Sequence, residues 1–145
     1  MKELLVSLML WIAANSPLVV PETVPNVVRI DPVELACILE YVVPCDESKL
    51  DSSWTWYAYY APKEPHGGGR IIVSEDVDLS GLDGHSVLLH ELVHHMQVTA
   101  GQEYNIECQA YQLEQKWLVE RGTSLQEVFS MGNIFVLLQT SCYEL

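Results

Sequence analysis

Apolar residues recur at three- and four-residue spacing in the second half of the chain and predict two consecutive helices. In the first helix the apolar positions are Val87, Leu88, Leu92, Val93 and Met96. This spacing is typical of a helix packed into a core, and Gly101 is placed to end it. A second periodic segment begins at about Asn105, which can cap it, and carries Ala110 and Tyr111 on one face. The short connection predicts that the two helices pack as a hairpin.

Two further segments in the first third of the chain have helical character. The apolar run 1–14 favours a buried helix, although a charged start followed by such a run also describes a signal peptide. Prolines predict an extended course over the surface from Pro17 to Arg29. Asp31 followed by Pro32 then predicts the capped start of a helix over 33–41.

Strand signals lie between the two pairs of helices. Residues 54–60 and 70–74 are rich in aromatic and β-branched residues, and a Pro/Gly-rich break separates them, so they predict an antiparallel hairpin. For the aromatic run 54–60, a packed sheet face is favoured over a platform for substrate. Ser124 to Glu127 forms a capping box that starts a last helix through about Gln139. The predicted order is helix, helix, hairpin and three helices, which is an α+β fold, mainly helical, with a small antiparallel sheet.

Length and charge limit the classes of function. With 145 residues, 49% of them hydrophobic, and no internal repeat, residues 1–145 form one domain that can bury a core. The net charge is −13 with only seven Lys and Arg residues, which opposes binding to nucleic acid or to anionic membrane surfaces. The apolar run at the N-terminus is too short to span a bilayer.

The four cysteines, at positions 37, 45, 108 and 142, allow three pairings and no zinc knuckle. A bridge between Cys108 and Cys142 would hold the C-terminus onto the predicted helical hairpin, and it requires an oxidising compartment. If the N-terminal segment is retained, reduced thiols and a cytoplasmic location are the expectation. If residues 1–16 act as a signal peptide, the location is extracytoplasmic.

The first predicted helix of the hairpin carries the pattern His90-Glu91-x-x-His94. Residues four apart share one face of a helix, so both imidazoles can reach one metal ion while Glu91 lies beside them. Two imidazoles and a carboxylate on an apolar helix would be costly to bury without a metal. One zinc ion is the expected cofactor, because it accepts two neutral His and one carboxylate and leaves a position open for water.

The second helix of the hairpin is expected to supply the third ligand. Glu107 opens the face that carries Ala110, Tyr111 and Glu114, and the hairpin brings its first turn near the last turns of the His helix. Glu107 is therefore the predicted ligand, with Glu103 and Glu114 as alternatives, and a plain N-terminal Glu that favours the helix dipole as the competing explanation. A donor must also stabilise the oxyanion of a reacting carbonyl, and the candidates are Tyr111, Tyr104 and His95. His95 could equally orient Glu91.

The sequence His90-Glu91-x-x-His94 followed by Glu107-x-x-Ala110-Tyr111 resembles the gluzincin metallopeptidases, and the single-domain minigluzincins in particular. The resemblance covers roughly residues 70 to 118. It implies a zincin-like domain with zinc on His90, His94 and Glu107. It further implies that the strand before the His helix, residues 71–74, offers its edge to an extended substrate. Compared with the larger gluzincins, the gap from His94 to Glu107 is short, and the chain lacks the long helical lobe that forms the lower wall of their cleft.

These patterns lead to one expected function and one alternative. The expected function is hydrolysis of peptide bonds in a peptide or protein substrate, with Glu91 as general base. The alternative is a latent or non-catalytic protein, an immunity-type binding module in which the metal only ties two helices together. A terminal helix that fills the site would make the protein latent.

Overall fold

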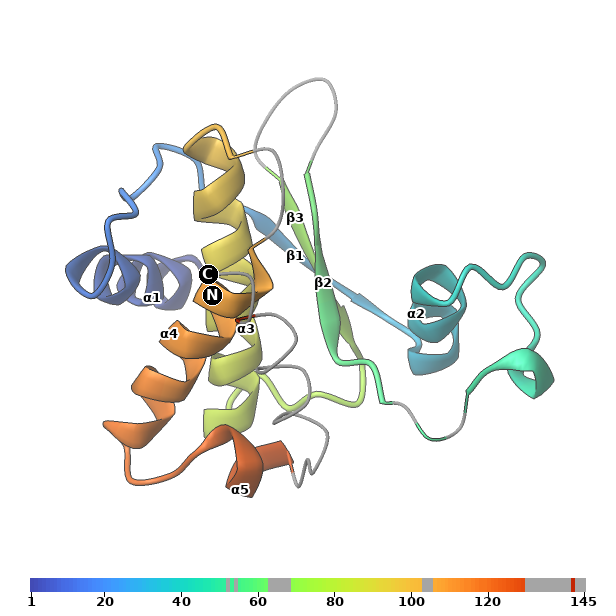
Figure 1. Ribbon diagram of the computed structural model, residues 1–145. Coiled ribbons are helices and arrows are strands. Elements are labelled where there is room, and N and C mark those ends of the chain that lie inside the picture. The colour runs from blue at the N-terminus through green and yellow to red at the C-terminus, as the bar shows by residue number, and fades with distance from the viewer. Residues whose placement is uncertain (52, 54, 63–68, 103–105, 130–141, 143–145) are drawn as a thin grey trace.

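The computed structural model describes residues 1–51, 53, 55–62, 69–102, 106–129 and 142, and Figure 1 shows their arrangement. The helices are α1 (Lys2–Ala14), α2 (Pro32–Leu39), the short 3₁₀ helix η1 (Glu47–Lys49), α3 (Leu82–Thr99), α4 (Glu107–Val119) and α5 (Leu125–Phe129). The strands are β1 (Asn26–Ile30), β2 (Ala58–Ala61) and β3 (Arg70–Ser74). Helices predominate over a small sheet, so the predicted α+β class is confirmed.

The sheet is mixed and has the order β1-β3-β2. β2 pairs with β3 antiparallel, as the predicted hairpin requires, with Tyr59 opposite Ile72. β1 pairs with β3 in parallel, with Val28 opposite Ile72, so the prediction of an extended surface segment up to Arg29 missed a strand. The last proline of that segment is Pro25, and the β-branched residues that follow it are free to pair.

The position of β3 also corrects the prediction about substrate. Because β3 lies between β1 and β2, its backbone groups pair on both sides, and it has no open edge to offer. Among the described strands, β1 and β2 form the edges of the sheet.

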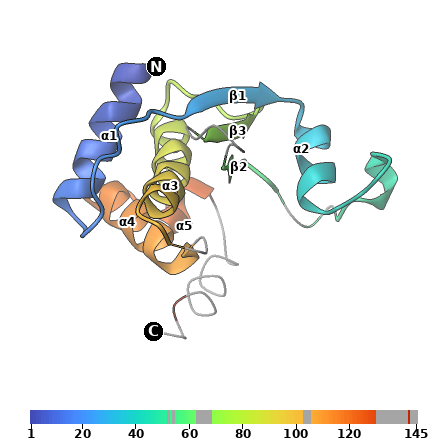
Figure 2. The same cartoon turned by 90° about the horizontal axis from the view of Figure 1, so that it is seen from above.

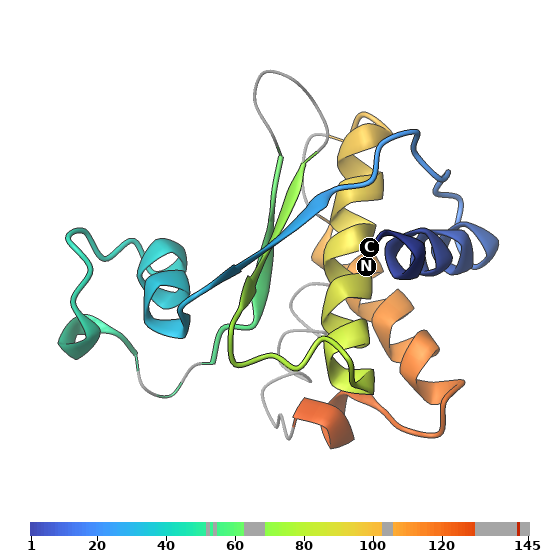
Figure 3. The ribbon, with the colours of Figure 1, turned by 180° about the vertical axis from the view of Figure 1, so that it is seen from behind.

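Helix α3 is the centre of the molecule, and its contacts define the core. It packs against α1 and α4 on one side and against β2 and β3 on the other, and Figures 1 and 3 show it between the helices and the sheet. Leu88, Leu89, Leu92, Val93 and Met96 are all buried there. The predicted helix over residues 1–14 is confirmed as α1, and it buries Leu5, Leu8, Met9 and Ile12.

Helix α2 lies apart from the other helices, at the far end of the sheet, as the view from above makes clear (Figure 2). Its predicted start is confirmed, since a carboxylate oxygen of Asp31 accepts hydrogen bonds from the backbone N–H groups of Val33 and Glu34, and Pro32 occupies the first turn. Gly101 follows the end of α3 with a φ of 83°, a conformation that glycine adopts without strain, as predicted.

The starts of α3, α4 and α5 lie within a few residues of the predicted helices. α3 begins at Leu82, so Gly84 lies inside the helix, where a Cβ atom would come within 2.0 Å of the Asp78 carbonyl oxygen. α4 has Ile106 at its N-cap, and Asn105, the predicted cap, lies outside the described residues. The Ser124 hydroxyl accepts from the N–H of Glu127 at the start of α5, as the capping box predicts, whereas the predicted course from residue 130 to Gln139 is outside the described part.

All four cysteines are paired. Cys37 bonds to Cys45, which braces the chain after α2, and Cys108 of α4 bonds to Cys142. The second pair is the bridge that the sequence analysis considered. Within the described residues, no helix has the length and apolar character needed to cross a membrane.

Candidate metal centre

Helix α3 presents His90, Glu91 and His94 from its middle turns, where the helix is enclosed by its neighbours. Their exposed fractions are 8%, 7% and 2%. The apolar residues on either side of the motif anchor α3 in the core, so these three polar side chains are fixed on a rigid element. The sequence prediction that the motif lies on one core-packed helix is confirmed.

Glu107, in the first turn of α4, lies next to His90 and His94. One of its carboxylate oxygens lies 2.5 Å from Nε2 of His94, and the other lies 3.3 Å from Nε2 of His90. The ligand atoms of the three side chains all lie within 4.8 Å of one another. Ligands of a tetrahedral zinc ion are about 3.3 Å apart, so this separation suits a single ion. The packing of α3 against α4 thus places together the three residues that were predicted as ligands.

Glu114, which was predicted as an alternative ligand, lies on the other side of the His90 ring. Its Oε1 lies 3.0 Å from Nδ1 of His90, and its Oε2 accepts a hydrogen bond of 2.5 Å from the Ser86 hydroxyl. The carboxylate is buried behind His90, on the side of the ring away from Glu107. It therefore orients the ring and leaves Nε2 to face the centre. Glu103, the other alternative, lies outside the described residues.

Gln97 orients the ring of His94 in the same way, through its side-chain amide. Its Oε1 lies 2.9 Å from Nδ1 of His94 and accepts a second hydrogen bond from the N–H of Ile106. Its amide nitrogen donates to the carbonyl of Ile106 and to Oε1 of Gln109. Gln97 was not predicted from the sequence, although its position three residues after His94, on the same side of the helix, could have indicated it.

The hydrogen bonds also fix which ring nitrogens carry protons. A side-chain carbonyl oxygen can only accept, so Nδ1 of His94 donates to Gln97, and in the neutral ring Nε2 then presents a lone pair. That lone pair faces a carboxylate oxygen of Glu107, which is also an acceptor. Two acceptors at this distance need a cation between them, either a proton or a metal ion. The donor set of the site therefore fits a metal.

The charges of the centre favour a cation as well. Burial disfavours the charged form of His90, but its hydrogen bonds to Glu107 and Glu114 outweigh burial, and the pKa of His90 lies well above its usual value. Burial likewise opposes charge on Glu107, yet hydrogen bonds from His90 and His94 hold the pKa of this carboxyl far below its usual range. Burial raises the pKa of Glu91, against the attraction of the two imidazoles. Three acidic groups and two imidazoles thus share one buried site.

Glu91 differs from the other two acids in having no partner. Its carboxylate makes no hydrogen bond or ion pair with any residue in the described ranges, whereas Glu107 and Glu114 are both engaged. It lies on the same helix as the ligand pair and retains a small exposed fraction of 7%. A buried, unpaired carboxylate whose pKa is raised is suited to accept a proton.

The three residues predicted as hydrogen-bond donors to the oxyanion differ in their positions. Tyr111 lies at the centre, with its ring 4.5 Å from that of His90, and burial followed by the charges of Glu107, Glu114 and Glu91 raises its pKa, so its hydroxyl keeps its proton. Tyr104 lies outside the described residues.

His95 is excluded from both of its predicted roles. Its Nε2 donates to the carbonyl of Thr23, and its Nδ1 accepts from the Tyr60 hydroxyl at 2.8 Å. Both ring nitrogens are therefore used on the side of α3 that faces β2, and burial lowers the pKa of the ring. The prediction that His95 donates to an oxyanion or orients Glu91 is wrong, because Tyr60 and the carbonyl of Thr23 occupy both of its ring nitrogens.

A comparison with protein families gives one match, which covers residues 1–144 and is described as a domain of unknown function, DUF6647. The chain belongs to this family. No curated protein and no solved structure matches the chain.

Proposed function

We propose that this protein is a zinc-dependent metallopeptidase whose ligands are His90, His94 and Glu107. The observation that carries the proposal is that the Nε2 atoms of His90 and His94 and the Glu107 carboxylate converge on one point. The Nδ1 atom of each ring is hydrogen-bonded to a second side chain on the opposite side of the ring. Three protein ligands leave a fourth position for water or substrate, which is the arrangement of catalytic rather than structural zinc sites.

The chain's own residues account for the proton transfers. A zinc ion in this centre would lower the pKa of a water molecule and polarise the scissile carbonyl. Glu91 accepts the proton of the attacking water, and the raised pKa of Glu91 helps it to hold that proton and deliver it to the leaving amine as the C–N bond breaks. Tyr111 contacts the ring of His90 and is proposed to donate its hydroxyl proton in a hydrogen bond to the oxyanion.

The sheet supports a peptide as the substrate. An extended peptide can add to the open edge of a sheet through backbone hydrogen bonds. β2 is at an edge and packs against α3, the helix that carries the motif. We therefore assign to β2 the role that the sequence analysis gave to residues 71–74.

The two disulfide bonds are relevant to the cellular compartment in which the protein acts. Bonds between Cys37 and Cys45 and between Cys108 and Cys142 persist in oxidising surroundings and are rare in the cytoplasm. They support an extracytoplasmic site of action, whereas the sequence alone favoured the cytoplasm.

Glu91→Gln tests the proposal directly. Zinc per chain is measured by mass spectrometry, and turnover is measured on a mixed peptide library. The wild type and Glu91→Gln should each hold one zinc ion, but the variant should lose activity by about 10² to 10⁴, because an amide cannot accept the proton. Glu107→Ala should lose the metal. Glu34→Gln, the same change at an exposed residue of α2, serves as the control.

Two results would contradict the proposal in different ways. Protein that holds no zinc would remove the metal centre. Protein that holds zinc but cleaves no peptide would support the alternative, a metal that only ties α3 to α4.

A further inference from the structure

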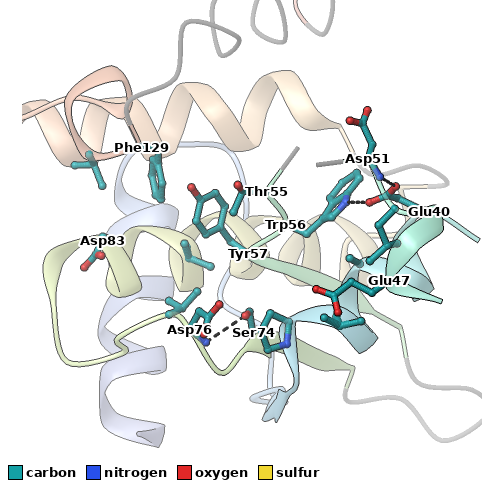
Figure 4. A pocket seen from close by; sticks show the side chains of 17 residues that line it. Glu40, Glu47, Asp51, Thr55, Trp56, Tyr57, Ser74, Asp76, Asp83 and Phe129 are labelled. Atoms are coloured by element: carbon teal, nitrogen blue, oxygen red, sulfur yellow. Dashed lines mark hydrogen bonds between the residues drawn. The ribbon is translucent and has the colours of Figure 1, made fainter. Parts of the chain in front are cut away.

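A second feature of the molecule is a pocket of about 460 Å³ beside the N-terminal part of α3. Its walls come from α2, from residues 55–57, from the turn after β3, from the first turns of α3 and from the end of α5, and Figure 4 shows the lining side chains. None of the three zinc ligands lines this pocket.

The lining is acidic, and Arg29, which donates hydrogen bonds to the carbonyls of Ser74 and Val77 at one wall, is a basic group that approaches it from outside. Five of the lining residues are Asp or Glu, and none is Lys, Arg or His. Glu40 is engaged, since it accepts hydrogen bonds from the Trp56 indole and the N–H of Asp51. The carboxylates of Glu47, Asp76 and Asp83, by contrast, have no hydrogen bond or ion pair among the described residues.

These carboxylates are too far apart to hold a metal ion. In the described part of the chain, only His90, His94 and Glu107 bring three ligand atoms close enough for one ion. The acids of the pocket instead stand around its walls, with Asp83 on one side and Glu47 on the other (Figure 4). Such a distribution suits an elongated cation.

Aromatic rings at one end of the pocket can contact the apolar part of such a cation. The rings of Tyr57 and Phe129 lie 5.1 Å apart at one end of the pocket. Burial and the charge of Asp83 raise the pKa of Tyr57, so the Tyr57 ring lies within the field of this carboxylate. Aliphatic stems pack on such rings while the charged head reaches an acid.

One helix, α3, carries both the proposed catalytic glutamate and part of the pocket wall. Val87 lines the pocket and precedes Glu91 by four residues, so the two share a face of α3, about 6 Å apart along the helix. Asp83 is one turn further, about 12 Å from Glu91 along the helix axis. A long side chain next to the scissile bond can span this distance.

We propose that this pocket binds the side chain of an arginine or lysine residue adjacent to the scissile bond. The inference rests on the proposed function, because only a peptidase would take a peptide into this pocket as substrate. The preference of the pocket for a cation, by contrast, follows from the lining residues alone. The protein is then a peptidase for basic peptides.

Matched peptides test the preference. Arginine and citrulline have nearly the same shape, but citrulline is neutral. Wild type should cleave an arginine peptide with a kcat/KM about tenfold or more above that of its citrulline counterpart. The double variant Asp76→Asn, Asp83→Asn should reduce this ratio to near one. The double variant Glu34→Gln, Glu75→Gln removes the same two charges at exposed residues outside the pocket and should keep the ratio. Equal cleavage of both peptides by wild type would overturn the inference while the peptidase remains.

A binding measurement separates the two proposals. Backbone amide signals of ¹⁵N-labelled full-length protein are followed by NMR during titration with Nα-acetyl-arginine amide or Nα-acetyl-citrulline amide. Signals of Tyr57, Val77 and Asp83 should shift with arginine amide and not with citrulline amide. If these shifts occur without any cleavage of peptides, the proposed function fails and the cation pocket stands. Absence of the shifts, or equal shifts with both probes, would overturn the pocket assignment.

Discussion

The two histidines of the centre differ in the group that holds the second ring nitrogen. Nδ1 of His90 faces a carboxylate oxygen of Glu114, whereas Nδ1 of His94 faces the amide oxygen of Gln97. A carboxylate attracts the ring N–H more strongly than an amide does, and this makes the opposite nitrogen a better donor to a metal. His90 is therefore expected to be the stronger of the two ligands.

The charge of Glu114 should matter more for zinc affinity than its shape. In Glu114→Gln an acceptor oxygen remains for His90 but the charge is lost, so the Kd for zinc should rise about 10- to 100-fold while the fold persists. Competition with a fluorescent chelator measures this constant. Ser86→Ala, which removes the other partner of Glu114 and keeps the charge, is the control and should have a smaller effect. Equal affinities of Glu114→Gln and wild type would show that Glu114 only packs.

The residues that could be predicted from sequence are those defined by spacing along a helix. His90 and His94 follow from a separation of four, and Glu107 follows from a short connection between two helices. The partners of the second ring nitrogens could not be derived in this way. Glu114 contacts His90 only because of the particular packing of α4 on α3, so spacing offered it as one ligand among several.

At the scale of elements, Gln97 connects α3 to the start of α4. Its amide is fully buried and joins His94 to both backbone groups of Ile106, the residue that precedes α4. The same side chain thus fixes the orientation of a ligand and the entry of the helix that supplies Glu107. The ligand geometry and the helix connection are coupled through it.

Gln97→Leu should therefore destabilise the domain as well as the centre. The apolar side chain has a similar size, but it removes four hydrogen bonds, one of them to the buried Nδ1 of His94 and three to part-buried groups of Ile106 and Gln109, each worth about 1 kcal/mol. We expect the free energy of unfolding, measured by urea titration with circular dichroism, to fall by about 3 kcal/mol or more. Gln109→Leu removes only one hydrogen bond of this set and should cost about 1 kcal/mol. A Gln97→Leu protein no less stable than the Gln109→Leu control would refute the coupling.

The elements that could be predicted are those whose contacts are local. α2, α3 and α4 were located from periodicity and caps, within a few residues of their bounds. β1 could not be found in this way, because its pairing with β3 joins residues about forty positions apart and the prolines before it suggested a surface segment. Gly84 precedes the apolar positions that predicted α3, and the close approach of the Asp78 carbonyl explains why a glycine lies within this helix.

At the scale of the whole molecule, the centre is part of the core. α3 contacts α1, α4, β2 and β3, and the ligands lie between α3 and α4 in the middle of this assembly. α2, with the nearby bond between Cys37 and Cys45, lies outside it at the end of the sheet (Figure 2). A change at the centre should therefore affect unfolding of the domain as a unit.

Removal of zinc tests this coupling. A ligand that binds only the folded state at 100 times its Kd adds about 2.7 kcal/mol to the free energy of unfolding. For a chain of 145 residues this corresponds to about 8 °C in Tm. Differential scanning calorimetry should thus show a Tm lower by about 8 °C after chelation, with recovery on addition of zinc. His94→Ala, which lacks a ligand, should melt at the same temperature with and without zinc. A wild-type Tm that does not respond to zinc would place the metal outside the cooperative core, or exclude it.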